Sequence, residues 1–162
     1  MISTVPKMEA RPESTEVTQL VDLVHEVLQS TLRQLHPTLA KEGITMGQFW
    51  AIRTVSSLET ASLSTVARYL GVSSPTVCAS IDELVAAGLV HRQRSERDRR
   101  AVELSLTPRG RKVEARVWRE MARVMAEAGR GVDSQDVQAA VRLFREVARR
   151  LDSVGAARRE SA

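Results

Sequence analysis

Small and hydroxyl-bearing side chains gather in residues 73–80, which read SSPTVCAS. Serine and threonine hydroxyls can donate hydrogen bonds to DNA phosphates and to base edges. A helix that carries them in place of long charged side chains is slim enough to enter a major groove about 12 Å wide. Helix capping is the alternative role for Ser73 and Ser74, and one residue can serve both roles. The candidate DNA contacts in this run are Ser73, Ser74, Thr76, Ala79 and Ser80.

A second candidate is the charged run RSERDRR at residues 94–100. An arginine here can reach into a narrow, A·T-rich minor groove, where the negative potential is concentrated. Arg100 would lose conformational entropy on binding, and Asp98, two residues earlier on the same hairpin face, can orient its guanidinium beforehand. Arg97 and Arg99 then point to the other face, where they can contact phosphates. The alternative is a charge run that only solvates the surface.

Two short helices are predicted to position the hydroxyl-bearing face. The first begins after Ser62, a good N-cap, and ends at Gly71, which tolerates the left-handed geometry of a tight turn. The second is the recognition helix, about residues 74–87, with Ser74 as its cap and Pro75 at its first position. The apolar stripe of this second helix comprises Val77, Ile81, Leu84 and Val85.

Residues 89–106 are predicted to form a β-hairpin around the charged run. The stretches before and after its hydrophilic tip alternate apolar and polar side chains, as strands do. Either Arg92 or Arg94 can pair with Glu103 across this hairpin, and contact with DNA phosphates is the weaker alternative for both arginines. A helix–turn–helix followed by a basic hairpin is a winged helix-turn-helix, which we place in residues 44–107.

The run LSTVARYLGVSSPTVCASIDELVAAGLV, followed by DRRAVELSLTPRG, resembles the MarR family of bacterial transcription regulators. The residues that carry most of this match are Asp98, Arg99, Arg100, Leu106, Thr107 and Gly110. The resemblance implies a mostly α-helical protein with a small β-wing, in which the winged helix-turn-helix is inserted between N- and C-terminal dimerisation helices. It further implies a ligand-responsive repressor that binds a pseudo-palindromic operator in double-stranded DNA as a homodimer.

Site residues also follow from the resemblance. It matches Asp98 and Arg100 to the two roles described above. Relatives are expected to carry an arginine near Ala79, and this chain does not. Contacts to thymine methyl groups and shape readout at the wing must therefore supply more of the specificity.

An effector site is implied as well, because relatives bind small aromatic acids in the crevice between the dimerisation helices and the winged unit. A small aromatic or phenolic effector is expected near Met46, Phe49 and Trp50. Ordinary core packing is the alternative for each of these three residues.

Amphipathic helices flank the winged unit, one at residues 15–36, in a region ended by Pro37 and Gly43, and others within residues 108–152. We expect part of their apolar surface to meet a second subunit, while packing inside one subunit is the alternative. Residues 1–14 are expected to be a flexible arm, and residues 153–162 a polar tail. The predicted dimer contacts are Val17, Leu20, Val21, Val24, Val141, Phe144, Val147 and Leu151.

Composition narrows the classes of function. The 162 residues suffice for one domain, and the formal net charge is +4, with all but three of the basic residues being arginines. Aromatic residues make up only 3%, which argues against proteins that stack single-stranded bases. The single cysteine, Cys78, excludes an internal disulfide and is expected to be a small hydrophobe, with redox sensing as the alternative.

No apolar run is long enough to span a membrane and no signal-peptide core is visible, so we expect a cytoplasmic protein. No catalytic pair, phosphate loop or metal-ligand spacing stands out, so we predict no enzyme, metal or cofactor. Two other classes stay open: a sequence-indifferent architectural DNA-binding protein, and a protein-interaction module that does not bind DNA.

Overall fold

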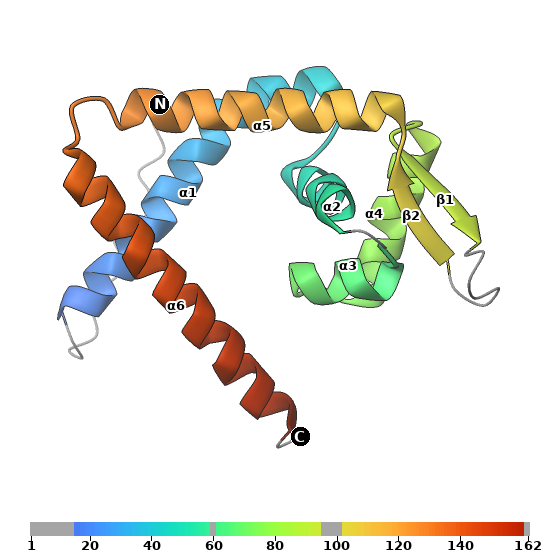
Figure 1. The fold of residues 1–162 in the computed structure, drawn as a ribbon. Coiled ribbons are helices and arrows are strands. Elements are labelled where there is room, and N and C mark those ends of the chain that lie inside the picture. The colour runs from blue at the N-terminus through green and yellow to red at the C-terminus, as the bar shows by residue number, and fades with distance from the viewer. Residues whose placement is uncertain (1–14, 59–60, 95–101, 161–162) are drawn as a thin grey trace, which may run out of the picture. The chain divides into compact units, whose positions relative to one another are not determined.

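The computed structural model describes residues 15–58, 61–94 and 102–160, in two compact units formed by residues 1–124 and 125–162. The helices are α1 (Thr15–Glu42), α2 (Met46–Ser57), α3 (Leu63–Leu70), α4 (Ser74–Ala86), α5 (Pro108–Ala128) and α6 (Ser134–Glu160). The strands β1 (Val90–Arg94) and β2 (Val102–Leu106) pair in an antiparallel hairpin between α4 and α5, which we call the wing (Figure 1). The fold is therefore mostly α with a small β-wing, as predicted.

Local capping signals begin and end the helices of the first unit. Thr45 forms a capping box with Gln48, and the Ser62 side chain accepts a hydrogen bond from the Thr65 N–H. Gly71 ends α3 with φ of 67°, so the predicted turn between α3 and α4 is confirmed. The predicted cap of α4 is wrong by one residue: Ser73 has extended backbone and accepts the Thr76 N–H, while Ser74 is already helical.

Pro37 does not end α1, contrary to the sequence prediction. The helix continues to Glu42, and Gly43 ends it with φ of 68°. A proline inside a helix removes one backbone hydrogen bond and costs about 3 kcal/mol. Here the turn that follows Pro37 carries Leu39, which is buried in the core together with Leu35. Burial of these apolar side chains offsets the cost of the proline.

The core of the first unit lies beneath α4 and the wing. Val77, Ile81 and Leu84 are buried there, whereas Val85, predicted to share their stripe, is exposed. Leu104 continues this core from β2, and its N–H donates to the Ala61 carbonyl at 2.8 Å. The inner face of α4 thus packs against the core, and most of its outer face does not.

The register of the wing corrects one predicted contact. Glu103 lies opposite Gln93, while Arg92 faces Leu104 and Arg94 faces Val102. Successive side chains on a strand point to opposite faces, so neither arginine is the cross-strand neighbour of Glu103. Arg92 pairs instead with a carboxylate on α4.

The second unit contains the end of α5 and all of α6. Asp133 caps α6, because its carboxylate accepts the Gln135 N–H at 2.6 Å. The polar tail predicted from residue 153 is corrected, since α6 continues to Glu160. The predicted arm at residues 1–14 lies outside the described residues. No helix in the described part of the chain is long and apolar enough to cross a membrane.

Candidate nucleic-acid interface

The hydroxyl-bearing face of α4 lies on the surface. Four of the five residues predicted to face outward are exposed, namely Ser73, Ser74, Thr76 and Ala79. The fifth, Ser80, is partly buried. Pro75 follows the cap at the start of α4, where its missing N–H has no intrahelical partner to lose. The arrangement presents short polar side chains at the N-terminal half of a rigidly held helix.

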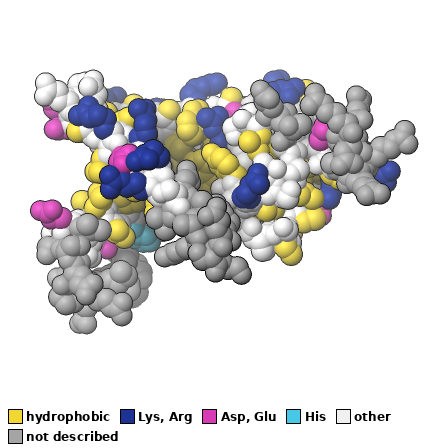
Figure 2. Space-filling view, turned by 60° about the horizontal axis from the view of Figure 1, so that its bottom comes forward, with side chains coloured by type: hydrophobic (Ala, Val, Ile, Leu, Met, Phe, Trp, Pro, Cys, Tyr) yellow, Lys and Arg dark blue, Asp and Glu magenta, His cyan; other side chains and the backbone are white. Residues whose placement is uncertain are grey.

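Positive charge comes to this face from its neighbours, because no lysine or arginine lies between Arg68 and Arg92. The two acidic residues of α4 are both engaged. Asp82 accepts a hydrogen bond from Arg92 of β1 at 2.6 Å, and Glu83 accepts one from the Gln48 side chain at 2.6 Å. Figure 2 shows lysines and arginines on one face of the described residues, with acidic side chains among them.

Cys78 sits on α4 one turn before Asp82 and is partly buried. Its thiol donates to the Asp82 carboxylate at a sulfur–oxygen distance of 3.6 Å. The cysteine was expected to be a small hydrophobe, and this polar contact was not foreseen.

The wing contacts predicted from the charge run, Arg97, Asp98, Arg99 and Arg100, lie outside the described residues. The strands that flank them are described, and they end at Arg94 and begin again at Val102. Their proposed roles continue to rest on the sequence.

The three residues predicted near an effector do not share one environment. Phe49 is fully buried in the core, and Met46 packs partly buried against it. Trp50 is 40% exposed, and its ring centroid lies 5.4 Å from that of Phe49. Core packing accounts for Phe49, whereas Trp50 is the one of the three that an added molecule can reach directly.

The sequence did not reveal a cluster of Arg53, Glu114 and Trp118 between α2 and α5. Arg53 donates to the largely buried Glu114 carboxylate at 2.5 Å, and its guanidinium carbon lies 4.0 Å from the centroid of the Trp118 ring. A charge-assisted hydrogen bond and a cation–π contact thus fasten the winged unit to α5. Helical periodicity places Glu114 near the apolar stripe, which is the only sequence signal for its burial.

Replacing Glu114 with glutamine should lower the free energy of unfolding by about 1 kcal/mol, because a charged hydrogen bond becomes a neutral one and Arg53 stays partly hydrated. Urea unfolding at a fixed protein concentration measures this. Glu120→Gln is the control, since Glu120 also pairs with an arginine on α5 but is only partly buried. Equal unfolding midpoints for the two variants would show that the Arg53–Glu114 pair stabilises the fold no more than the Glu120–Arg123 pair does.

The predicted dimer contacts leave much apolar surface uncovered within one chain. Leu20 and Val24 of α1 are partly buried and Val21 is exposed, while the side chain of Val17 is outside the described residues. On α6, all four predicted residues are exposed: Val141, Phe144, Val147 and Leu151. The sequence prediction omitted other exposed apolar residues of the same two helices, namely Leu23, Val27, Leu28, Val137 and Leu143.

Glu146, Arg149 and Arg150 pair with one another on the polar face of α6. Hydrogen bonds from Arg149 and then Arg150 hold the pKa of the Glu146 carboxylate below its usual range. These three polar groups find partners one turn away, whereas the apolar residues of α6 are exposed.

A helix–turn–helix followed by a two-stranded wing defines the class of winged-helix proteins. Residues 42–101 match the model of the MarR family. Over this region the chain is similar to that family, and its fold is that of solved MarR winged-helix proteins.

The chain spans less than two thirds of the length of the curated relatives it matches, and several solved structures share its fold. The organic hydroperoxide resistance transcriptional regulator of Bacillus subtilis (strain 168) is 32% identical over 92 residues, which are 57% of this chain and 63% of that regulator. The structure of BpsR from Bordetella bronchiseptica, whose DNA binding is regulated by 6-hydroxynicotinic acid, has a TM-score of 0.66 at 23% identity, covering 80% of this chain and 98% of its own. The repressor CouR, bound to a 23-mer DNA duplex, has a TM-score of 0.69 at 23% identity, covering 86% and 99%.

Proposed function

We propose that this protein is a DNA-binding transcription regulator that represses genes by binding a pseudo-palindromic operator as a homodimer in the cytoplasm. The observation that carries the proposal is the exposed, hydroxyl-bearing face of α4 beside a two-stranded wing, in a region that matches the MarR family. Such a helix fits a major groove, and an adjacent hairpin can reach the neighbouring minor groove. CouR, which shares the fold, has been solved on duplex DNA.

The exposed apolar residues of α1 and of α6 support the proposal of a dimer. A second copy of the chain would cover them, and a two-fold dimer would place two recognition helices about 34 Å apart, one turn of the duplex. A stable dimer also explains why a chain with so few base-reading side chains can select a site, because the two half-sites are read together.

An effector would act by favouring one spacing of the two recognition helices over another. A ligand shifts such an equilibrium only when it binds the two arrangements unequally. BpsR responds to 6-hydroxynicotinic acid, a small aromatic acid. For this chain we propose a small aromatic or phenolic effector near the exposed ring of Trp50 and the partly buried Met46.

The test of the wing is Arg100→Ala, which should weaken binding to the preferred duplex at least tenfold while dimerisation stays unchanged. The reason is that a guanidinium in a narrow minor groove contributes strongly through shape readout. A gel-shift titration measures the affinity, and size-exclusion chromatography measures the oligomer.

Arg119→Ala is the matched control for that variant, because it removes the same charge from an exposed position on α5. If Arg100→Ala binds like the parent protein, the assignment of the wing is wrong. If the parent itself prefers no sequence over random duplex, the proposal of an operator-binding repressor is wrong.

A second candidate function is architectural DNA binding without sequence preference. The observation in its favour is that α4 offers short side chains and no lysine or arginine for base reading. Contacts to phosphates alone give a steep salt dependence and little discrimination between sequences. The ratio of affinities for preferred and random duplexes at one salt concentration therefore separates the two functions.

A further inference from the structure

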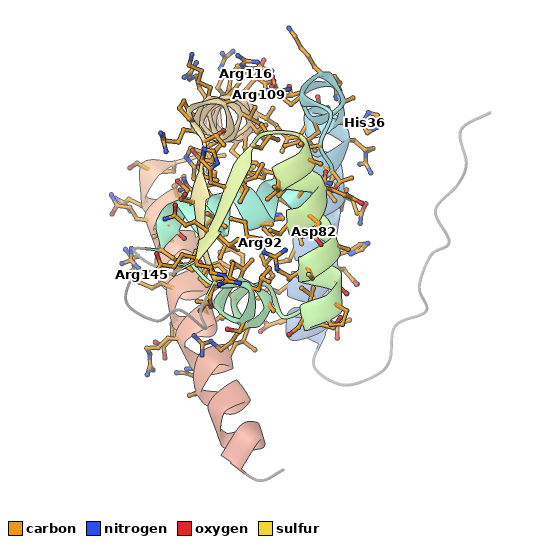
Figure 3. All side chains as sticks on the ribbon, turned by 90° about the vertical axis from the view of Figure 1, so that its right-hand side faces the viewer. His36, Asp82, Arg92, Arg109, Arg116 and Arg145 are labelled. Carbon is orange, nitrogen blue, oxygen red and sulfur yellow. The ribbon has the colours of Figure 1, made fainter. Side chains whose placement is uncertain are left out.

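Asp82 and Arg92 join the recognition helix to the first strand of the wing. Asp82 lies on α4 and Arg92 on β1, and the carboxylate oxygen is 2.6 Å from the guanidinium nitrogen. Figure 3 labels both residues and shows them side by side between these two elements. The side chains are 56% and 35% exposed, so the pair sits at the surface, where a duplex bound to α4 and the wing would pass.

The start and the remainder of β1 are held differently. Val90 is buried in the core, whereas His91, Arg92, Gln93 and Arg94 are all exposed. Of the side chains of β1, only that of Val90 packs in the core, and the rest of the strand is held by its pairing with β2. The ion pair adds a direct side-chain attachment between β1 and α4, two residues beyond Val90.

Asp82 places a negative charge on the helix that we propose to bind DNA. A carboxylate near phosphates is repelled, and α4 has no basic side chain of its own to offset this. Arg92 neutralises the carboxylate from the neighbouring strand. The Asp82–Arg92 pair thus neutralises the carboxylate and also holds β1 close to α4.

We propose that Asp82 is a positioning residue that sets DNA specificity by holding Arg92, and with it β1, against the recognition helix. With this attachment, α4 and the wing approach the duplex as one rigid unit, so the right major-groove sequence and the right minor-groove shape must coincide. Without it, the wing adjusts independently and tolerates other sequences. The inference rests on the proposed operator-binding function.

Glu83 offers a matched control one residue away. It carries the same charge on the same helix and is also exposed, but it bonds to Gln48 on α2 rather than to an arginine of the wing. Asp82→Asn and Glu83→Gln each remove one negative charge, so a general electrostatic gain in DNA affinity appears equally in both. Asp82 also accepts a hydrogen bond from the Cys78 thiol, so a difference between the two variants reports the link to Arg92 when Arg92→Gln shows it too.

The experiment measures two affinities at one salt concentration: for a duplex that the parent protein selects from a randomised pool, and for a random duplex of equal length. Their ratio should fall about threefold in Asp82→Asn and stay unchanged in Glu83→Gln, a size expected for a surface ion pair. Arg92→Gln should lower the ratio equally, and the double variant should lower it no further, because the pair acts as one unit. Asp82→Glu, which can still reach Arg92, should keep most of the ratio.

The inference is overturned if Asp82→Asn and Glu83→Gln give the same ratio, or if the effects of Asp82→Asn and Arg92→Gln add. In those cases the proposed function still stands, provided that the unmodified protein selects one duplex from the randomised pool. If the unmodified protein prefers no duplex, both the proposed function and the positioning role of Asp82 are wrong. Thermal unfolding of each variant distinguishes loss of the fold from loss of specificity, and an unfolded Asp82→Asn would also overturn a purely positioning role.

Discussion

Replacing Phe144 with aspartate should turn the protein into a folded monomer and reduce its affinity for a palindromic duplex at least a hundredfold. Phe144 is 48% exposed on α6, in line with Val137, Val141 and Leu151, which are exposed too. A phenylalanine half open to water in one chain contributes its remaining burial to the dimer contact. A carboxylate in its place would have to be dehydrated without a partner, which opposes association.

The loss of DNA affinity follows from the loss of the dimer. Two linked half-sites gain about two to four orders of magnitude over one, because binding of the second half is intramolecular. Size-exclusion chromatography with light scattering measures the oligomer, and fluorescence anisotropy with a labelled duplex measures the affinity.

Ala139→Asp provides the control for the dimer prediction. Ala139 is exposed on the same helix, and helical spacing places it on the opposite face, near Glu146. The added charge is the same, so only the face differs. Monomers from both variants would indicate that α6 does not tolerate a new carboxylate anywhere, and a Phe144→Asp dimer would remove α6 from the interface.

Replacing Gly110 with alanine should lower the free energy of unfolding by about 3 kcal/mol, a large fraction of the 5–15 kcal/mol typical of a domain. A Cβ atom at this position would lie 2.0 Å from the backbone carbonyl oxygen of Leu89. The oxygen belongs to the backbone and the Cβ would be fixed to its own Cα, so neither atom can rotate away as the end of a flexible side chain would. The helix must shift, and the contacts at the start of α5 shift with it.

Those contacts bind the start of α5 to the end of the recognition helix. The Thr107 N–H donates to the Leu89 carbonyl at 3.1 Å, and the Thr107 hydroxyl donates to the Gly88 carbonyl at 2.8 Å. The same hydroxyl accepts the N–H of Gly110 at 2.9 Å. Displacement of α5 by an added methyl group therefore strains several hydrogen bonds around a buried turn.

Gly47→Ala is the control for the Gly110 prediction, because Gly47 also lies in the first turn of a helix. A Cβ there would meet only the Thr45 side-chain oxygen, at an ordinary 3.9 Å. Alanine favours helix over glycine, so this variant should be as stable as the parent or slightly more so. Chemical unfolding of both variants measures their free energies of unfolding. One protein concentration is used throughout, since a dimer's stability depends on concentration. If Gly110→Ala unfolds with the parent, the close approach is relieved without cost.

The order of the elements and the outward face of α4 could be predicted from the sequence. Thr45, Ser62 and Asp133 each cap a helix a few residues away, and Gly71 supplies a left-handed turn. These signals act between neighbours in the chain, so they are readable without knowing what packs on them. The apolar period of α4 fixed which side faces inward, and the opposite side follows from it.

Other features depended on residues far apart in the sequence. α1 continues past Pro37 because a core built from several elements buries Leu39. Arg92 pairs with Asp82 rather than with Glu103, and Gly110 lies close to the backbone of Leu89. No pattern among neighbouring residues in the sequence specifies either contact. The sequence by itself therefore determined the local elements and the face that the recognition helix presents. Only the tertiary structure decided its charge partners and its attachment to the wing and α5, because these depend on distances that folding creates.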